Sequence, residues 1–171
     1  MEIQSLSTRY AVRRLTPQDI EEIYLLASGN ELFYRYHPPF VTRESLLEDM
    51  NVLPKGKTEK DKAFIGFFEG ERLIAVMDII MDYPAEKTAW IGWLITAKSE
   101  QRKGVGSQIA AECETYFRKI GVKEIGLAID KGNPQSAAFW KKNGFLQKDK
   151  EIPNGFSAYI SMKKTLKSID D

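Results

Sequence analysis

Residues 101–107 read Gln-Arg-Lys-Gly-Val-Gly-Ser and separate a long apolar run from an amphipathic segment. The run at residues 88–95 (TAWIGWLI) is typical of a central strand covered on both faces by helices. Residues 106–120 carry apolar side chains at helical spacing, and Gly121 ends the pattern. The first amides of a helix lack intrahelical acceptors and lie at the positive end of its dipole. The heptapeptide therefore predicts a phosphate-binding turn before a helix.

The glycines of this turn would allow its backbone to approach an anion closely. Gly104 and Gly106 would let the backbone reach a ligand and adopt conformations that other residues resist. Arg102 and Lys103 can add positive charge around the same anion. A simple turn or a close-packing position remains an alternative for a glycine pair. No Gly-Lys-Ser/Thr ends the stretch and the third glycine of Gly-x-Gly-x-x-Gly is missing, so nucleotide hydrolases and dehydrogenases are disfavoured.

The pattern around this turn predicts one strand, two helices, three strands, a helix, a strand, a helix and two strands. The expected strands are residues 10–15, 63–68, 72–81, 88–95, 125–129, 145–150 and 157–163. The expected helices follow Thr16-Pro17, Thr42, Gly106 and Asn133-Pro134. A turn is expected at residues 152–155, and Gly92 would leave room for a close neighbour on the central strand.

Composition narrows the class of protein. A chain of 171 residues with 43% hydrophobic and 29% charged residues suits one globular domain, and the net charge of +1 gives no general attraction to nucleic acid or membranes. No leader or membrane span is evident, so we expect a cytoplasmic protein. The single cysteine, Cys113, falls on an apolar helix face and should be a buried thiol. With one histidine, His37, we expect no metal site.

A second segment, residues 133–145 (NPQSAAFWKKNGF), follows the glycine turn by about thirty residues. Together the two segments resemble the GNAT superfamily of acyl-CoA-dependent N-acetyltransferases. Gln101, Gly104 and Gly106 match its pyrophosphate motif, Gln/Arg-x-x-Gly-x-Gly/Ala, and the second segment is similar to its Asn…Ala…aromatic…Gly-Phe helix. The resemblance implies an α/β (α+β) fold, a single domain over residues 1–171. Its central mixed, mostly antiparallel sheet would have six to seven strands flanked by about four helices.

The resemblance also implies acetyl-CoA as co-substrate and no metal. The strand ending at residues 94–96 would splay from the strand at residues 125–129, and the pantetheine arm would pair with exposed backbone in the gap. Asn133 would hydrogen-bond that arm, although its local sequence equally suits a helix N-cap. The cofactor-binding residues implied are Leu94, Ile95, Thr96, Gln101, Arg102, Lys103, Gly104, Val105, Gly106, Ser107 and Asn133.

The implied reaction is direct attack of an acceptor amine on the acetyl thioester. Trp140 stands where many family members have a tyrosine that protonates the departing sulfur, and an indole cannot supply that proton. Water, Tyr159 or Tyr83 would protonate the sulfur, or no acid is needed. Trp140 itself is better explained as core or cleft wall.

Asp78 and Asp82 are the catalytic candidates, because alternation within residues 72–81 and beyond would put both on one strand face. Either could accept the amine proton or anchor a cationic acceptor, and a solvated strand face is the alternative. Glu100 is a further candidate. Residues 31–40 (ELFYRYHPPF) could form an apolar wall of the acceptor site or pack beneath a loop, with His37 structural in the absence of a partner.

We expect an N-acetyltransferase acting on a primary amine, first of all that of a small molecule. A protein amino terminus or lysine is the enzymatic alternative. A catalytically weak acyl-CoA-binding regulatory module, suggested by Trp140, and an interaction protein without ligand are the other hypotheses. A homodimer is possible. The sequence fixes neither the acceptor, nor the base and acid, nor whether acyl chains other than acetyl are used.

Overall fold

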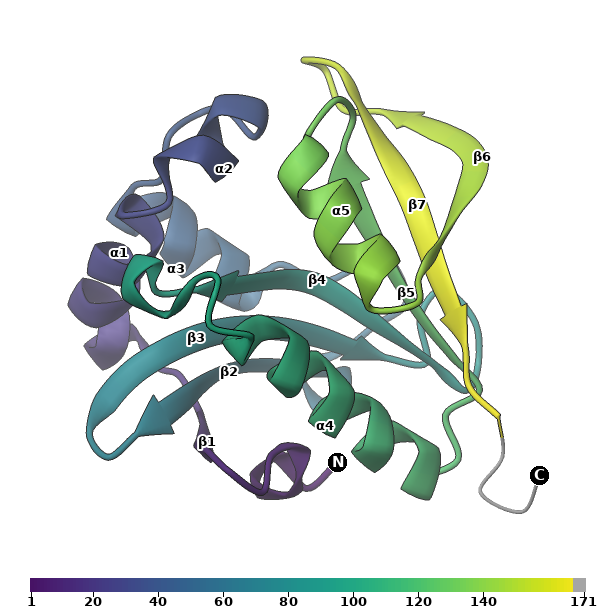
Figure 1. Ribbon diagram of the computed structural model, residues 1–171, viewed down its shortest axis with the longest axis horizontal. Helices are drawn as coiled ribbons and strands as arrows, with labels where there is room; N and C mark the ends of the chain where they lie inside the picture. The colour runs from purple at the N-terminus through teal and green to yellow at the C-terminus, as the bar shows by residue number, and fades with distance from the viewer. Residues whose placement is uncertain (168–171) are drawn as a thin grey trace.

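The computed structural model describes residues 1–167, with only the backbone of Asp149, so the last four residues of the predicted domain lie outside it. Within this range one sheet of seven strands has the order β1-β2-β3-β4-β5-β7-β6 (Figure 1). Only the β4–β5 pair is parallel. The predicted mixed, mostly antiparallel sheet is therefore confirmed. Its strands are β1 (Ala11–Arg14), β2 (Lys62–Glu69), β3 (Arg72–Met81), β4 (Thr88–Thr96), β5 (Glu124–Asp130), β6 (Leu146–Pro153) and β7 (Ala158–Thr165).

The helices flank this sheet. They are α1 (Ile20–Ser28), α2 (Glu31–Tyr36), α3 (Arg43–Asn51), α4 (Val105–Lys119) and α5 (Pro134–Lys142), with short 3-10 turns η1 (Ile3–Leu6), η2 (Pro17–Asp19), η3 (Glu59–Asp61) and η4 (Lys98–Glu100). In Figure 1 the first three helices gather at one side, while α4 and α5 cross the face toward the viewer. Of the helices in residues 1–167, none has the length and apolar character to cross a membrane.

Two apolar cores fill the two faces of the sheet. On one face the stripe of α4, including Ile109, Cys113 and Phe117, packs with inward residues of β2 such as Phe67. The alternate residues of the same strand, including Phe64, pack under α1 and α3. Phe117 is fully buried, and burying a side chain of that size stabilises the fold by ~1.5–3 kcal/mol. The buried Cys113 confirms the prediction, and burial raises the pKa of its thiol and keeps it protonated.

Local signals start the helices where the sequence indicates. Thr42 Oγ1 accepts a hydrogen bond from Ser45 N at 3.0 Å, and Ser45 Oγ accepts one from Thr42 N at 3.0 Å. This reciprocal cap begins α3. Asp19 Oδ2 likewise accepts from Thr16 N at 2.7 Å, which fixes the 3-10 turn that leads into α1.

Two local expectations are wrong. The segment expected only as a connection contains the short helix α2, whose first turn is closed by a bond from Phe33 N to Asn30 O. The last turn is not at residues 152–155, because β6 continues to Pro153, which pairs with Ala158. Asn154 Oδ1 instead accepts from Ser157 N at 2.6 Å and organises the turn at residues 154–157.

The feature that positions the site is the divergence of β4 from β5. The two strands pair only from Thr88 to Ile91 and from Glu124 to Leu127. Beyond those residues β4 continues along β3 and β5 continues along β7, so the strands splay as expected (Figure 1). The register of β4 shifts at Gly92, which is an extra residue with no counterpart in β3. An open strand edge results at this point.

Candidate active site

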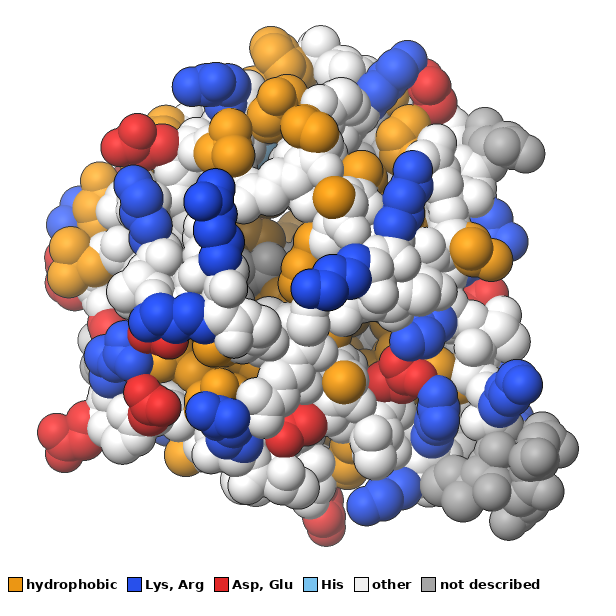
Figure 2. All heavy atoms as spheres, viewed as in Figure 1, with side chains coloured by type: hydrophobic (Ala, Val, Ile, Leu, Met, Phe, Trp, Pro, Cys, Tyr) orange, Lys and Arg blue, Asp and Glu red, His pale blue; other side chains and the backbone are white. Residues whose placement is uncertain are grey.

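A cavity of about 900 Å³ occupies the gap between the splayed strands. Its opening is visible in Figure 2 as a hollow bordered by Lys and Arg side chains. The walls come from β4, β5, α2, α3, α5 and the turn before α4. The predicted cofactor residues on this lining are Leu94, Ile95, Thr96, Gln101, Arg102, Gly104, Val105, Gly106 and Ser107. The volume is in the range of small-molecule sites.

The turn before α4 offers free backbone donors. No residue in the described part of the chain accepts a well-formed hydrogen bond from the amides of residues 102–107. Gln108 is the first residue whose amide bonds back, to Gly104 O at 2.9 Å. These amides stand at the positive end of a 15-residue helix, so the turn has the donors that a phosphate group requires.

The two glycines of the turn serve different purposes. Gly104 has φ +82°, a conformation that favours glycine, and a Cβ there would meet no described atom within 4 Å. Gly106 is helical, but a Cβ would lie 3.2 Å from Phe139 Cε2. Gly104 therefore shapes the turn, while Gly106 lets the start of α4 approach α5.

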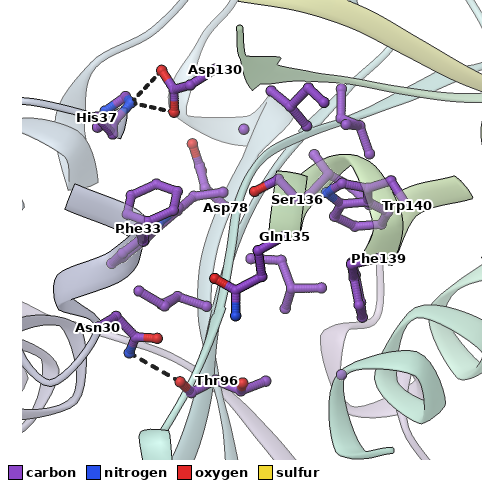
Figure 3. A pocket seen from close by; sticks show the side chains of 18 of the residues that line it. Asn30, Phe33, His37, Asp78, Thr96, Asp130, Gln135, Ser136, Phe139 and Trp140 are labelled. Atoms are coloured by element: carbon purple, nitrogen blue, oxygen red, sulfur yellow. Dashed lines mark hydrogen bonds and ion pairs between the residues drawn. The ribbon is translucent and has the colours of Figure 1, made fainter. Parts of the chain in front are cut away.

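Side chains around the turn hold it in place. Gln101 Nε2 donates to Asn30 Oδ1. Asn30 Nδ2 in turn donates to Thr96 O at 3.1 Å, as Figure 3 shows. Glu100 is buried and accepts a hydrogen bond from Arg72 at 2.7 Å. That guanidinium lowers the pKa of the Glu100 carboxyl, so Glu100 serves as an anchor of the turn rather than as a base.

The cations at this end are arranged differently from the expectation. Arg102, with φ +62°, lines the cavity. Lys103 lies off the lining, with Nζ 3.7 Å from Glu100 Oε2. Lys142 at the end of α5 also lines the cavity, and sequence reasoning missed it because only folding brings α5 beside α4.

Asp78 lies at the other end of the cavity, on β3. Its Oδ2 accepts a hydrogen bond from Lys62 Nζ at 2.8 Å, and only 6% of the Lys62 side chain is exposed. Its Oδ1 is buried and finds no hydrogen-bond donor within residues 1–167. Burial raises the pKa of the Asp78 carboxyl, and the Lys62 ammonium opposes that shift. Asp78 is thus a carboxylate held in a low-polarity cavity wall.

The segment at residues 31–40 forms an aromatic wall over this end. Phe33, Tyr34 and His37 line the cavity, so this segment forms one of its walls, and that the wall serves the acceptor stays a prediction. His37 Nδ1 lies 3.1 Å from each carboxylate oxygen of Asp130, the last residue of β5 (Figure 3). That carboxylate raises the pKa of the His37 ring.

Charge differs between the two ends of the cavity. Glu48 and Asp49 of α3 line it beside Asp78 and Asp130. Asp49 is exposed at the edge of the cavity, but the surrounding protein partly desolvates its carboxyl and raises the pKa, and no described residue forms an ion pair with it. The turn before α4 is cationic, whereas the opposite end of the cavity is acidic. The cavity therefore suits an anionic ligand at one end and a cationic ligand at the other.

Residues 20–145 match the sequence profile described as the acetyltransferase (GNAT) family. The match spans most of the chain and includes both the turn and α5. The chain belongs to the GNAT acetyltransferase family. It is accordingly an acyl-CoA-dependent N-acetyltransferase that uses acetyl-CoA. No curated protein matches the sequence at a significant level.

Solved structures share the fold of this GNAT protein. An acetyltransferase from Thermus thermophilus superposes with a TM-score of 0.70 at 19% identity, covering 92% of this chain and 97% of the other. The PaiA N-acetyltransferase from Thermoplasma acidophilum in complex with coenzyme A gives 0.66 at 22% identity, with 91% and 98% covered. A mutant spermidine N-acetyltransferase from Vibrio cholerae gives 0.66 at 18% identity, with 94% and 95% covered.

The residues of this GNAT enzyme fit coenzyme A by their own geometry. The free amides of residues 102–107 suit its pyrophosphate, and the open edge of β4 after Ile91 suits an extended arm with amide groups. Within residues 1–167 no three or more His, Cys, Asp or Glu side chains gather to hold a metal ion.

Asn133 is an N-cap in this structure. Its Oδ1 accepts a hydrogen bond from Ser136 N at 3.1 Å, its side chain is buried, and it is absent from the cavity lining. The Nδ2 group has no hydrogen-bond partner among the described residues. A contact from Asn133 to pantetheine stays a prediction. Gln135 and Ser136, in the first turn of α5, point into the cavity and were missed by sequence reasoning (Figure 3).

Asp82 does not share the site with Asp78. The expectation that both lie on one strand face is wrong, because β3 ends at Met81 and Asp82 has φ +53°. Its Oδ1 accepts a hydrogen bond from Lys87 N at 2.7 Å and so fixes the turn between β3 and β4. The short polar side chain of Asp suits such a turn.

Trp140 is a wall residue, as expected. It is buried and packs edge-on against Phe139 and Phe145, with ring centroids 4.8 and 4.9 Å away. Of the two tyrosines considered as acids, Tyr159 lines the cavity. Tyr83 lies outside the lining and packs edge-on against Trp90, which does line the cavity.

Proposed function

We propose that this enzyme transfers the acetyl group of acetyl-CoA to a primary amine of a small molecule by direct attack. The supporting observation is one continuous cavity that runs from the free amides before α4 to the buried carboxylate of Asp78. Acetyl-CoA supplies an activated acyl thioester when it is bound. The protein then has to orient the amine, take up a proton and exclude water.

The chain's own residues divide these tasks. The turn from Arg102 to Ser107 holds the pyrophosphate, and the open edge of β4 orients the arm by backbone hydrogen bonds. Asp78 faces the acceptor, either as an anchor for its ammonium group or as the acceptor of its proton. The aromatic side chains of Phe33 and Tyr34 shield the reacting groups from water.

A small, cationic amine is favoured over a protein substrate. The acceptor end carries Glu48, Asp49 and Asp78 and is walled by α2, so it suits a compact amine with positive charge. The spermidine N-acetyltransferase that shares the fold acts on such an amine. A protein amino terminus or lysine is the second candidate. One domain over residues 1–171, a cytoplasmic location and a homodimer stay predictions.

The test is release of coenzyme A thiol from acetyl-CoA across a panel of small amines and amino-terminal peptides. We expect turnover that depends on the small amine and saturates with it. Asp78→Asn should lower kcat/KM by at least tenfold, about 1.4 kcal/mol, while the Kd for coenzyme A stays unchanged. Exposed Glu44→Gln on α3 is the matched control for loss of one carboxylate.

Other outcomes identify the rival hypotheses. Turnover confined to peptides would indicate a protein acetyltransferase. Tight coenzyme A binding without turnover on any amine would indicate a binding module and overturn the proposed activity.

A further inference from the structure

His37 and Asp130 come from distant parts of the chain and meet at the acceptor end of the cavity. His37 follows α2 and Asp130 ends β5, 93 residues later. The Asp130 side chain is 7% exposed, whereas the His37 side chain is 41% exposed. The carboxylate is therefore fixed in the protein while the ring remains accessible.

The contact settles which ring nitrogen carries the proton. A carboxylate only accepts hydrogen bonds, so His37 Nδ1, at 3.1 Å from both Asp130 oxygens, must donate. In the neutral ring the lone pair then lies on Nε2, on the opposite edge from Asp130. Among residues 1–167 no group forms a hydrogen bond with that nitrogen. His37 therefore has a free proton-accepting nitrogen.

Two aromatic side chains fix the plane of the ring. Phe33 stacks on His37 with centroids 5.2 Å apart and planes at 29°. Tyr159 of β7 lies at 6.3 Å and 27°. Packing on its faces and the bond at Nδ1 leave the imidazole little freedom to turn. Figure 3 shows His37, Asp130 and Asp78 around the same end of the cavity.

Asp78 is less suited to accept a proton than His37. One of its oxygens is buried, and the other already accepts a hydrogen bond from Lys62. Burial raises the pKa of the Asp78 carboxyl, but the Lys62 ammonium opposes that shift and occupies the oxygen that could take up a proton. His37 has neither restriction, and it lines the same cavity.

We propose that His37, oriented by Asp130, is the general base of the acetyl transfer, and that Asp78 anchors the acceptor. This inference rests on the proposed function. The acceptor ammonium gives one proton to Nε2, which releases it to solvent. The freed nitrogen attacks the acetyl carbonyl carbon, so that a C–N bond forms and the C–S bond breaks. The second proton lost by nitrogen neutralises the departing sulfur.

The charges around His37 suit this role. Asp130 of β5 raises the pKa of the ring most, burial lowers it, and Asp49 of α3 raises it further. The phenols of Tyr34 on α2 and Tyr159 on β7 and the carboxyls of Glu48 on α3 and Asp78 on β3 are the other titratable groups that line this end within residues 1–167. A base whose pKa lies near the working pH combines a free lone pair with good proton affinity.

Two variants separate a base from a structural contact. In His37→Asn the amide nitrogen can still donate to Asp130, but no proton-accepting nitrogen remains. In Asp130→Asn an oxygen can still accept from Nδ1, but the negative charge is gone. We expect His37→Asn to lower kcat about 100-fold or more. Asp130→Asn should move the acidic limb of the kcat/KM profile to lower pH, because the Asp130 carboxylate of the wild-type enzyme raises the pKa of the His37 ring.

The measurement is the pH dependence of amine-dependent thiol release, with circular dichroism and coenzyme A affinity as checks on folding. A kcat near that of the wild type in His37→Asn would overturn the proposal and would leave His37 with a structural role only. An unmoved acidic limb in Asp130→Asn would also overturn it. Failure of the wild-type enzyme on every amine is a different result, because it rejects the proposed function itself.

Discussion

The Asp78 carboxylate lies directly over the α carbon of Gly92, so that a Cβ at Gly92 would be 2.7 Å from Asp78 Oδ2. Gly92 is also the extra residue of the β4 bulge. One glycine thus opens the strand edge and makes room for the carboxylate that faces the acceptor.

Gly92→Ala should displace Asp78 from Lys62 and from the cavity wall. We expect kcat/KM to fall at least tenfold, with a loss of ~1–3 kcal/mol in stability from overpacking. The Kd for coenzyme A should hold, because the phosphate-binding turn lies elsewhere. Gly29→Ala is the control, since its Cβ would make only ordinary contacts from 3.5 Å outward. Equal activity in both variants would argue against the role of Asp78.

The buried ion pair between Lys62 and Asp78 gives a test of stability. Lys62→Met should cost ~3–5 kcal/mol at neutral pH in urea unfolding, because it leaves a carboxylate buried without its cation. Adding Asp78→Asn to that variant should recover part of the loss. A double variant no more stable than Lys62→Met would show that the charge is not the cause.

The same variant should respond to pH with a defined sign. Burial raises the folded pKa of Asp78 above its unfolded value, and removal of Lys62 takes away the opposing effect. A carboxyl with a raised folded pKa favours the folded state at low pH and loses that contribution as pH rises. The deficit of Lys62→Met should therefore be smaller at pH 4 than at pH 7. A constant deficit would contradict this assignment.

Sequence reasoning succeeded where the signal is local. The cap at Thr42, the glycine turn before α4 and the apolar strand predicted at residues 88–95 each depend on neighbours within a few positions. It failed where a role depends on folding. Asp82 looked equivalent to Asp78 by alternation, but the strand ends at Met81.

The side-chain pairs at the acceptor end of the cavity have no local signal in the sequence. Lys62 meets Asp78 only through the β2–β3 register, and His37 meets Asp130 across 93 residues. No pattern in one sequence predicts such pairs, so the sequence indicated Asp78 alone, and its partner Lys62 and the pair of His37 and Asp130 came from the structure. The free donors before α4 could be predicted because they are consecutive backbone amides at the start of one helix.

A substitution at Gly104 tests whether the turn before α4 binds the phosphate groups of coenzyme A. Gly104→Ala should cost ~1–2 kcal/mol, because φ +82° is unfavourable for a residue with a Cβ. The strained turn should also misplace its amides and raise the Kd for coenzyme A about tenfold. Gly155→Ala is the matched control, since Gly155 also has φ +82° and lies in the β6–β7 turn off the cavity lining. Equal coenzyme A affinity in the two variants would argue against this binding site.

A substitution at Asp49 tests whether the acidic end of the cavity binds a second cationic group of the acceptor. It has no ion-pair partner among the described residues, and it lines the cavity from α3, across from Asp78 on β3. Once Asp78 holds the reacting ammonium, Asp49 is free to contact a second cationic group on the same acceptor. Asp49→Asn should then raise KM for a linear diamine about five- to tenfold, ~1–1.4 kcal/mol, and leave KM for a monoamine of equal length unchanged.

The contrast between the two amines separates this role from a general change in the cavity. A structural defect in Asp49→Asn would raise both KM values together, and so would a loss of long-range attraction to cations. The diamine should keep its kcat, because the second ammonium binds equally in the ground state and in the transition state. Adding 0.5 M salt should narrow the difference, since Asp49 is accessible to solvent and its attraction is screened. Steady-state kinetics with both amines at two salt concentrations decides between these explanations.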